Sequence, residues 1–189
     1  MLFRSDSGGI VICKNKNKLN IACAREKIEK SLRRNYYYSN REWPYKNVKP
    51  KIIVEKYLED KESYSIKDYK FFCFNGEPKF IYVSEGLENH STAKISFFDL
   101  NFKPMPFKRS DYSAFETIPQ KPINLDLMIK FSKILSKNIP HVRVDFYEVN
   151  KKLYFGELTF FTCSGFIPFE PIEWDLKLGE MLKLPFEKE

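Results

Sequence analysis

Two apolar stretches joined by Asn75-Gly76 constrain the fold of this 189-residue chain more than any other feature of its sequence. The stretches, residues 69–74 and 79–83, are rich in aromatic and β-branched residues, a composition typical of strands. Asparagine and glycine readily adopt the positive φ angles that a tight turn between paired strands needs. The sequence therefore predicts an antiparallel hairpin that turns over residues 75–78.

The rest of the chain adds further strands and a few helices. A second hairpin is predicted over residues 142–149 and 153–160, turning through residues 150–152. Other segments with a strand pattern are residues 10–13, 52–57 and 94–99. Helical spacing of apolar residues predicts helices over residues 21–34, 125–138 and 172–182, the first two capped by Asn20 and Asn124. A segment with four prolines, residues 104–122, is expected to be a surface loop. The pattern indicates an α+β fold in which antiparallel hairpins pack against a few helices.

Charge is distributed unevenly along the chain, whose formal net charge is +7. Residues 1–51 hold 13 Lys and Arg against 4 Asp and Glu, whereas residues 52–189 hold 19 against 21. A concentrated basic segment attracts anions such as nucleotide phosphates, acidic polymers, nucleic acid or anionic lipid. A solvated basic face with no partner is the alternative. The sequence contains no RNP, zinc-finger or helix-turn-helix pattern, so no specific nucleic-acid partner is expected.

Composition argues against several other classes of protein. No apolar run approaches the roughly 20 residues that span a bilayer, and residues 1–9 lack the apolar region of a secretion signal. We therefore expect a cytoplasmic protein with no transmembrane segment. The four cysteines include no Cys-x-x-Cys pair, which favours reduced, buried thiols. Because the chain has two histidines, a structural zinc site is not expected.

The second hairpin carries charged residues within otherwise apolar strands. Arg143 and Asp145 are two residues apart and share a face, as do Glu157 and Thr159. Simple antiparallel pairing about residue 151 places Asp145 opposite Glu157. Two opposed carboxylates on a buried face repel each other unless a cation lies between them, and Mg²⁺ usually takes one or two carboxylates together with substrate phosphates. The hairpin therefore predicts a magnesium site, with a solvated charged face or a paired Arg143 as the alternative.

Two weaker patterns are compatible with phosphate binding. Ser7-Gly8-Gly9, which precedes a predicted strand, could wrap a phosphate with backbone N–H groups or form an ordinary turn. The longer glycine-rich patterns of nucleotide-binding loops are absent. Lys70 and Lys56 lie within strand patterns, where a lysine that faces inward requires an anion and one that faces outward does not.

Four long stretches of the sequence resemble the TupA-like branch of the ATP-grasp superfamily. They are IIVEKYLED (52–60), DYKFFCFNGEPKFI (68–81), FFDLNF (97–102), and the run from VRVDFYEVN to EWDLKLG (142–179). The resemblance extends from about residue 5 to residue 185. It implies an ATP-grasp-like fold in which two lobes clamp ATP. Residues 1–189 would then form one ATP-grasp domain, with residues 1–54 in the first lobe and residues 55–189 in the second.

The resemblance also implies an activity. Enzymes of this superfamily use ATP and Mg²⁺ to phosphorylate a carboxylate and then let an amine attack the acyl phosphate. TupA-like members are associated with the biosynthesis of teichuronopeptide, capsule and other surface polysaccharides in bacteria. The implied partners are therefore ATP, a carboxylate substrate, an amine substrate and an acidic surface polymer.

Roles for individual residues follow from the same resemblance. The loop that closes over the β- and γ-phosphates resembles Ser7, Gly8 and Gly9. The interlobe hinge that holds adenine and ribose resembles Glu55, Lys56, Tyr57 and Leu58. Lys70 is similar to a phosphate or substrate contact, and Arg143 to the arginine that stabilises the transferring phosphoryl group. The Mg²⁺ ligands resemble Asp145 and Glu157, the two carboxylates already singled out by strand pairing.

The sequence also departs from the family pattern. Thr159 stands where many ATP-grasp enzymes have an asparagine, and Leu2 stands near the position of a phosphate-binding lysine. We expect an N-terminally truncated domain, or a partner that supplies the missing lobe. The alternatives are a polysaccharide glycosyltransferase, although no Asp-x-Asp sequence is present, and a catalytically inactive ATP-grasp fragment.

Overall fold

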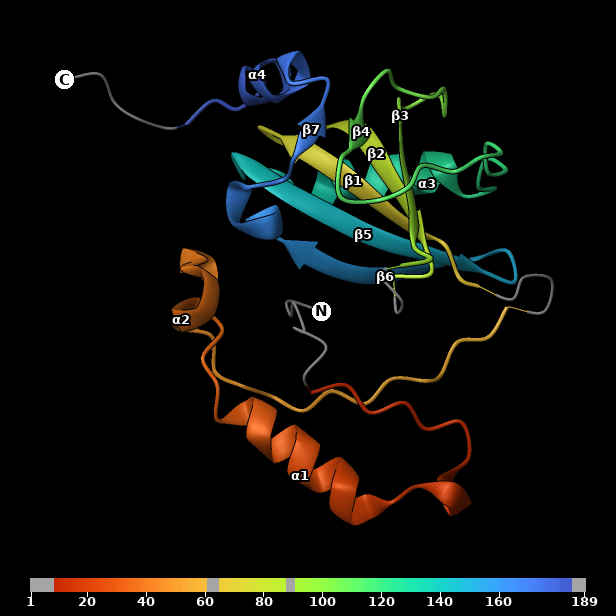
Figure 1. Cartoon of the computed structure of the whole chain (residues 1–189), viewed down its shortest axis with the longest axis vertical. Coiled ribbons are helices and arrows are strands. Elements are labelled where there is room, and N and C mark those ends of the chain that lie inside the picture. The colour runs from red at the N-terminus through yellow and green to blue at the C-terminus, as the bar shows by residue number, and fades with distance from the viewer. Residues whose placement is uncertain (1–8, 61–64, 88–90, 185–189) are drawn as a thin grey trace. The chain divides into compact units, whose positions relative to one another are not determined.

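The computed structural model describes residues 9–60, 65–87 and 91–184 (Figure 1). It divides the chain into two compact units, with the main boundary between Glu59 and Asp60. The larger unit combines a mainly antiparallel sheet with helices, which confirms the α+β fold class. Within the described ranges, no helix is long and apolar enough to cross a membrane.

The smaller unit is built from short helices joined by irregular backbone. Its elements are η1 (Lys16–Lys18), α1 (Ile21–Leu32), α2 (Tyr37–Asn40) and η2 (Trp43–Tyr45). Asn20 caps α1 as predicted, because its side chain accepts a hydrogen bond from the backbone N–H of Cys23 at 3.0 Å. The strands predicted at residues 10–13 and 52–57 are not formed. No strand among the described residues pairs with either segment, and an unpaired strand is not stable alone.

The larger unit is organised around a five-stranded sheet in the order β3-β2-β1-β5-β6 (Figure 1). The strands are β1 (Asp68–Phe74), β2 (Glu77–Glu85), β3 (Lys94–Phe98), β5 (His141–Val149) and β6 (Lys152–Thr159), and all neighbours pair antiparallel. Both predicted hairpins are confirmed. The first turns through Asn75 and Gly76, at φ angles of 52° and 82°. The second turns through two residues, Asn150 and Lys151, rather than three.

Each face of the sheet is covered by a different set of elements. On one face, α3 (Leu125–Leu135) packs over a cluster that includes Phe71, Met128 and Val144. The opposite face carries a second cluster around Phe72 and Phe107, built with the short strands β4 (Lys108–Arg109) and β7 (Phe169–Glu170), with η3 (Thr162–Gly165) and with α4 (Glu173–Gly179). The expected loop over residues 104–122 thus contains a strand, β4, which pairs with β7.

The interaction at the start of α3 is not the side-chain cap that the sequence predicted. Asn124 precedes the helix, but its side chain makes no capping hydrogen bond and instead donates to Glu148 on β5 at 2.8 Å. The Glu148 carboxylate also accepts the backbone N–H groups of Ile123 and Asn124, at 3.1 and 2.7 Å. An anion at this position satisfies N–H groups that have no partner within the helix and favours the helix dipole. The carboxylate therefore fixes α3 to the sheet.

The four cysteines are free thiols, but they are not all buried as the sequence predicted. Cys73 is buried in β1, whereas Cys13 and Cys163 are half-buried and Cys23 is exposed. Burial raises the pKa of the Cys73 thiol to about 12, so that it remains protonated and packs as an apolar side chain.

Candidate functional site

A row of polar side chains crosses the face of the sheet that also carries Phe72. Lys70 on β1 lies directly opposite Asp145 on β5, and Asp68 lies opposite Tyr147. Directly opposed residues project to the same side of a sheet, and so do residues two apart along a strand. We call this row the polar face; its members are Asp68, Lys70, Ser84, Arg143, Asp145, Tyr147, Glu157 and Thr159.

A β-bulge in β6 determines which side of the sheet Glu157 occupies. The pairing of β5 with β6 shifts by one residue between Val144 and Phe146, so Gly156 and Glu157 together oppose the single residue Asp145. Continued regular pairing from the turn would have put Glu157 opposite Val144, on the other face. The predicted pairing of Asp145 with Glu157 is therefore achieved by a two-residue turn followed by a bulge.

Glycine is required at the bulge because the space beside it is filled. A Cβ atom on Gly156 would lie 2.9 Å from a ring carbon of Tyr147 and 3.1 Å from the backbone oxygen of Asp145. Both distances are too short for a normal contact. A side chain at residue 156 would therefore displace the Tyr147 ring or the backbone of Asp145.

Asp145 is the centre of a buried ion-pair network. Its carboxylate accepts two hydrogen bonds from Arg143, from Nε at 2.7 Å and from an Nη atom at 2.6 Å, and one from Lys70 Nζ at 2.9 Å. Asp145 has no exposed surface, and Lys70 and Arg143 are each 7% exposed. Burial alone would raise the pKa of the Asp145 carboxyl, but the charges of Arg143 and Lys70 hold it below its ordinary value.

Glu157 also contacts Arg143, but its pKa is shifted in the opposite direction from that of Asp145. It accepts hydrogen bonds from Arg143 at 3.3 Å and from the hydroxyl of Thr159 at 3.2 Å. Burial raises the pKa of the Glu157 carboxyl, and the negative charge of Asp145 raises it further. The cation between the two opposed carboxylates is thus the guanidinium of Arg143. Neighbouring carboxyls whose pKa values are driven apart are a frequent feature of catalytic sites.

Asp68 extends the network toward β2. Its Oδ2 atom lies 3.5 Å from Lys70 Nζ and accepts a hydrogen bond from the Ser84 hydroxyl at 3.3 Å. Burial raises the pKa of the neighbouring Tyr147 hydroxyl, and the charge of Asp68 adds to that shift. The polar face therefore holds three carboxylates against two cations when every group is ionised.

The carboxylates on the polar face fit a magnesium ion in type and in charge. Across the described parts of the chain, no group of three or more His, Cys, Asp and Glu residues is placed to hold a metal. Mg²⁺ commonly uses only one or two carboxylates and completes its shell with water and phosphate oxygens. Asp145 and Glu157 supply two, and with Asp68 the polar face carries one more negative than positive charge when every group is ionised.

The structure brings together four of the residues that the sequence singled out: Lys70, Arg143, Asp145 and Glu157. Of the predicted glycine loop, Ser7 and Gly8 lie outside the described residues. Gly9 is described, and a Cβ atom on it would lie 2.5 Å from the Ser31 hydroxyl, so it packs tightly beside α1.

The predicted adenine hinge lies in the smaller unit. Glu55, Lys56, Tyr57 and Leu58 follow irregular backbone, and the Lys14 ammonium lies 5.0 Å from the centre of the Tyr57 ring. The nucleotide-binding roles of the glycine loop and of the hinge remain predictions.

Sequence reasoning missed Arg109, a second buried arginine above the same face of the sheet. Arg109 lies on β4, and its positive charge acts on the pKa of the Tyr82 hydroxyl. Tyr82 on β2 pairs with Lys70 on β1. Burial raises the pKa of the Tyr82 hydroxyl, and Arg109 and Arg143 both partly oppose that rise. Arg109 lies in a proline-rich segment without a period of two or of 3.6, so no pattern could place it.

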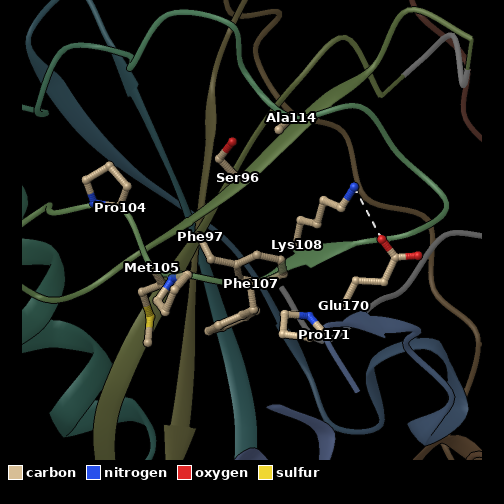
Figure 2. Close-up of a pocket in the computed structure, with 10 residues that line it drawn as sticks. Ser96, Phe97, Pro104, Met105, Phe107, Lys108, Ala114, Glu170 and Pro171 are labelled. Carbon is tan, nitrogen blue, oxygen red and sulfur yellow. Dashed lines mark ion pairs between the residues drawn. The ribbon is translucent and has the colours of Figure 1, made fainter. Parts of the chain in front are cut away.

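A mainly apolar pocket of about 620 Å³ lies at the edge of the sheet, beside β3 (Figure 2). Phe97, Met105 and Phe107 contribute to its lining, and an ion pair of 3.2 Å joins Lys108 to Glu170 beside it. The pocket contains no member of the polar face, so it is a separate feature of the larger unit.

A protein-family model described as TupA-like ATPgrasp matches residues 3–183, which is nearly the whole chain. No curated protein and no solved structure matches the chain.

Proposed function

Because the chain belongs to the TupA-like ATP-grasp family, we propose that it uses ATP to join a carboxylate to an amine through an acyl phosphate. The observation that carries the proposal is the polar face, where Lys70 and Arg143 are held beside Asp145 and Glu157. We assign the reaction to the biosynthesis of bacterial surface polysaccharide or teichuronopeptide, as the family resemblance implies.

The two cations are suited to phosphoryl transfer. Negative charge on the transferring group and on the leaving phosphate is stabilised by fixed positive groups in a site of low polarity. Arg143 is oriented by its two hydrogen bonds to Asp145. None of the described residues accepts a hydrogen bond from its Nη1 atom, so that nitrogen is available to a phosphoryl oxygen. Lys70 supplies a second positive charge from the neighbouring strand.

The carboxylates have a complementary task. Asp145 and Glu157 would hold Mg²⁺, which when bound neutralises phosphate charge and makes the phosphorus more electrophilic. Thr159 donates its hydroxyl hydrogen to Glu157 and accepts a hydrogen bond from Arg143 at 2.9 Å, so it keeps both side chains in position. Asp68 places a second carboxylate beside Lys70, at 3.5 Å from its Nζ atom.

Mg·ATP binding is the experiment that tests the nucleotide site. We expect calorimetry to show binding by the wild-type chain and at least tenfold weaker binding by Asp145→Asn and by Glu157→Gln. Glu77→Gln is the matched control, because Glu77 is half exposed in an ion pair with Lys133 at the turn of the first hairpin. Equal binding by all four proteins would refute the proposed role of the two carboxylates.

The reaction type needs a separate test. An acyl phosphate reacts with hydroxylamine to give a hydroxamate, so a library of carboxylates can be tested with Mg·ATP and hydroxylamine for coloured product and ADP. We expect hydroxamate from at least one carboxylate and none after Arg143→Met or Lys70→Met. Turnover of a nucleotide sugar without ATP would instead support a glycosyltransferase.

A further inference from the structure

Arg109 is an arginine whose hydrogen-bonding capacity is only partly used. Asp111 binds one edge of its guanidinium, accepting hydrogen bonds from Nε at 2.7 Å and from Nη2. The centre of the Tyr112 ring lies 4.9 Å from the Cζ atom of Arg109. The Nη1 atom contacts only the sulfur of Cys163 among the described residues, at 3.8 Å, and sulfur is a weak acceptor. Among the described residues, Nη1 thus has no oxygen partner, and the edge that Nη1 forms with Nη2 is bonded to oxygen only through Nη2.

The loop that faces this edge has two unusual properties. Cys163 and Ser164 both have left-handed backbone, with φ angles of 50° and 56°, followed by Gly165 at 85°. Thr162 is 5% exposed, and its hydroxyl has no hydrogen-bond partner in the described structure. Left-handed non-glycine residues and buried polar atoms without partners are both costly and occur together at binding sites.

The charge of the surroundings selects the ligand. Arg109 and Asp111 form a neutral pair, so the open edge favours a monoanion over a dianion such as phosphate. A planar carboxylate matches two parallel N–H groups of a guanidinium, and a neighbouring hydroxyl can donate a third hydrogen bond. Arg109 also lies above the same sheet face as Lys70, since Phe107, two residues before it, packs in one cluster with Phe72 on that face.

We propose that Arg109 binds a carboxylate of the acceptor substrate, in a subsite bordered by Thr162–Gly165. Asp111 and Tyr112 hold the guanidinium so that its free edge faces the ligand. The proposal rests on the proposed function in one respect, that the bound carboxylate belongs to a substrate of the ligase. Lys108, the preceding residue, lies on the other side of β4 beside the apolar pocket (Figure 2), so the subsite and the pocket are distinct.

The test follows the arginine Nε–Hε resonances of the ¹⁵N-labelled full chain during titration with acetate at constant ionic strength. We expect one resonance to shift and saturate, no shift with the neutral isostere acetamide, and loss of the saturable shift in Arg109→Lys. Arg25→Lys, on the exposed surface of α1, is the matched control and should bind acetate as the wild type does. Linear shifts, or the same saturation in Arg109→Lys, would overturn the proposal.

A second variant separates binding from folding. Thr162→Val removes the unpartnered hydroxyl while keeping the side-chain volume, so we expect unchanged or higher thermal stability together with about tenfold weaker acetate binding. If Arg109→Lys does not fold, the wild-type titration and Thr162→Val decide the question, and unchanged affinity in Thr162→Val counts against the subsite. Mg·ATP binding is measured on the same samples. Acetate binding without Mg·ATP binding leaves the subsite standing while the proposed function fails, and the reverse result leaves the function without this subsite.

Discussion

Replacing Asp145 by asparagine tests whether the polar face is held together by charge. The substitution keeps the size and shape of the side chain but removes the negative charge from between Arg143 and Lys70. Three short hydrogen bonds, of 2.6, 2.7 and 2.9 Å, lose the ionised acceptor. Both cations lie in largely buried positions, since Lys70 and Arg143 are each 7% exposed.

The size of the effect follows from the burial of the network. Removing one partner of a buried ion pair costs about 3–5 kcal/mol, because the other charge is left uncompensated. The amide of asparagine still accepts one hydrogen bond, and Glu157 remains 3.3 Å from Arg143. We therefore expect Asp145→Asn to lower the free energy of unfolding by about 3 kcal/mol, a large part of the roughly 5–15 kcal/mol typical of a domain.

Urea denaturation followed by the fluorescence of Trp174 measures this change. Trp174 packs against Phe107 at a ring separation of 4.7 Å, so it reports on the larger unit. Trp43 lies in the smaller unit and is replaced by phenylalanine in every protein compared. Asp126→Asn is the control, because Asp126 is exposed in the first turn of α3 and should cost no more than about 0.5 kcal/mol.

The pH dependence provides an independent check. The pKa of Asp145 is depressed in the folded chain, so its contribution is present above the ordinary aspartate value of 3.8 and is lost as the pH falls through the folded pKa. The difference between wild type and Asp145→Asn should therefore shrink on acidification. A loss below about 1 kcal/mol at neutral pH, the range of exposed ion pairs, would refute the argument that this network is buried.

Three further predictions concern other residues of the larger unit. Gly156→Ala should destabilise the larger unit by about 1–3 kcal/mol in urea denaturation, because the added Cβ meets the Tyr147 ring at 2.9 Å; an unchanged midpoint would contradict this. Glu157 has a raised pKa, so its contribution to stability is present below the ordinary value of 4.5 and is lost as the pH rises through the folded pKa. Glu157→Gln should therefore gain stability relative to wild type between pH 4.5 and 7, and parallel pH profiles would exclude the shift. Glu148→Gln should speed amide hydrogen exchange at the start of α3, since Glu148 accepts the N–H groups of Ile123 and Asn124; unchanged exchange would show that the charge is not needed.

The hairpins were predictable because their signals are local. Asn75-Gly76 between apolar strands specifies a turn within a few residues, and the alternation around Arg143 and Asp145 assigns both to one face. The opposition of Asp145 and Glu157 was also anticipated, although through a longer turn than the one that forms. A bulge has no reliable sequence signature except a glycine within a strand, which here is Gly156.

Other features depend on contacts that sequence does not display. The segments at residues 10–13 and 52–57 have strand composition, but strand formation requires a partner, and the described residues provide none. Arg109 is buried because Phe107 and Phe169 hold β4 and β7 over the sheet, a tertiary effect within a segment that reads as a loop. The hydroxyl of Thr162, which has no hydrogen-bond partner among residues 9–60, 65–87 and 91–184, likewise shows only in three dimensions.

Because β6 contains a bulge, the effect of deleting one of its residues depends on which side of the bulge the deletion falls. Gly156 is the extra residue between the turn and Glu157, so its deletion would restore an uninterrupted ladder with Glu157 still opposite Asp145. Deletion of a residue between Glu157 and Thr159 would instead move Thr159 to the opposite side of the sheet, away from Arg143. Deletion of Gly156 would thus keep the polar face, whereas deletion of Leu158 would remove Thr159 from it. Whether an insertion or deletion in this hairpin preserves the polar face therefore depends on its position and on whether it adds or removes an odd number of residues.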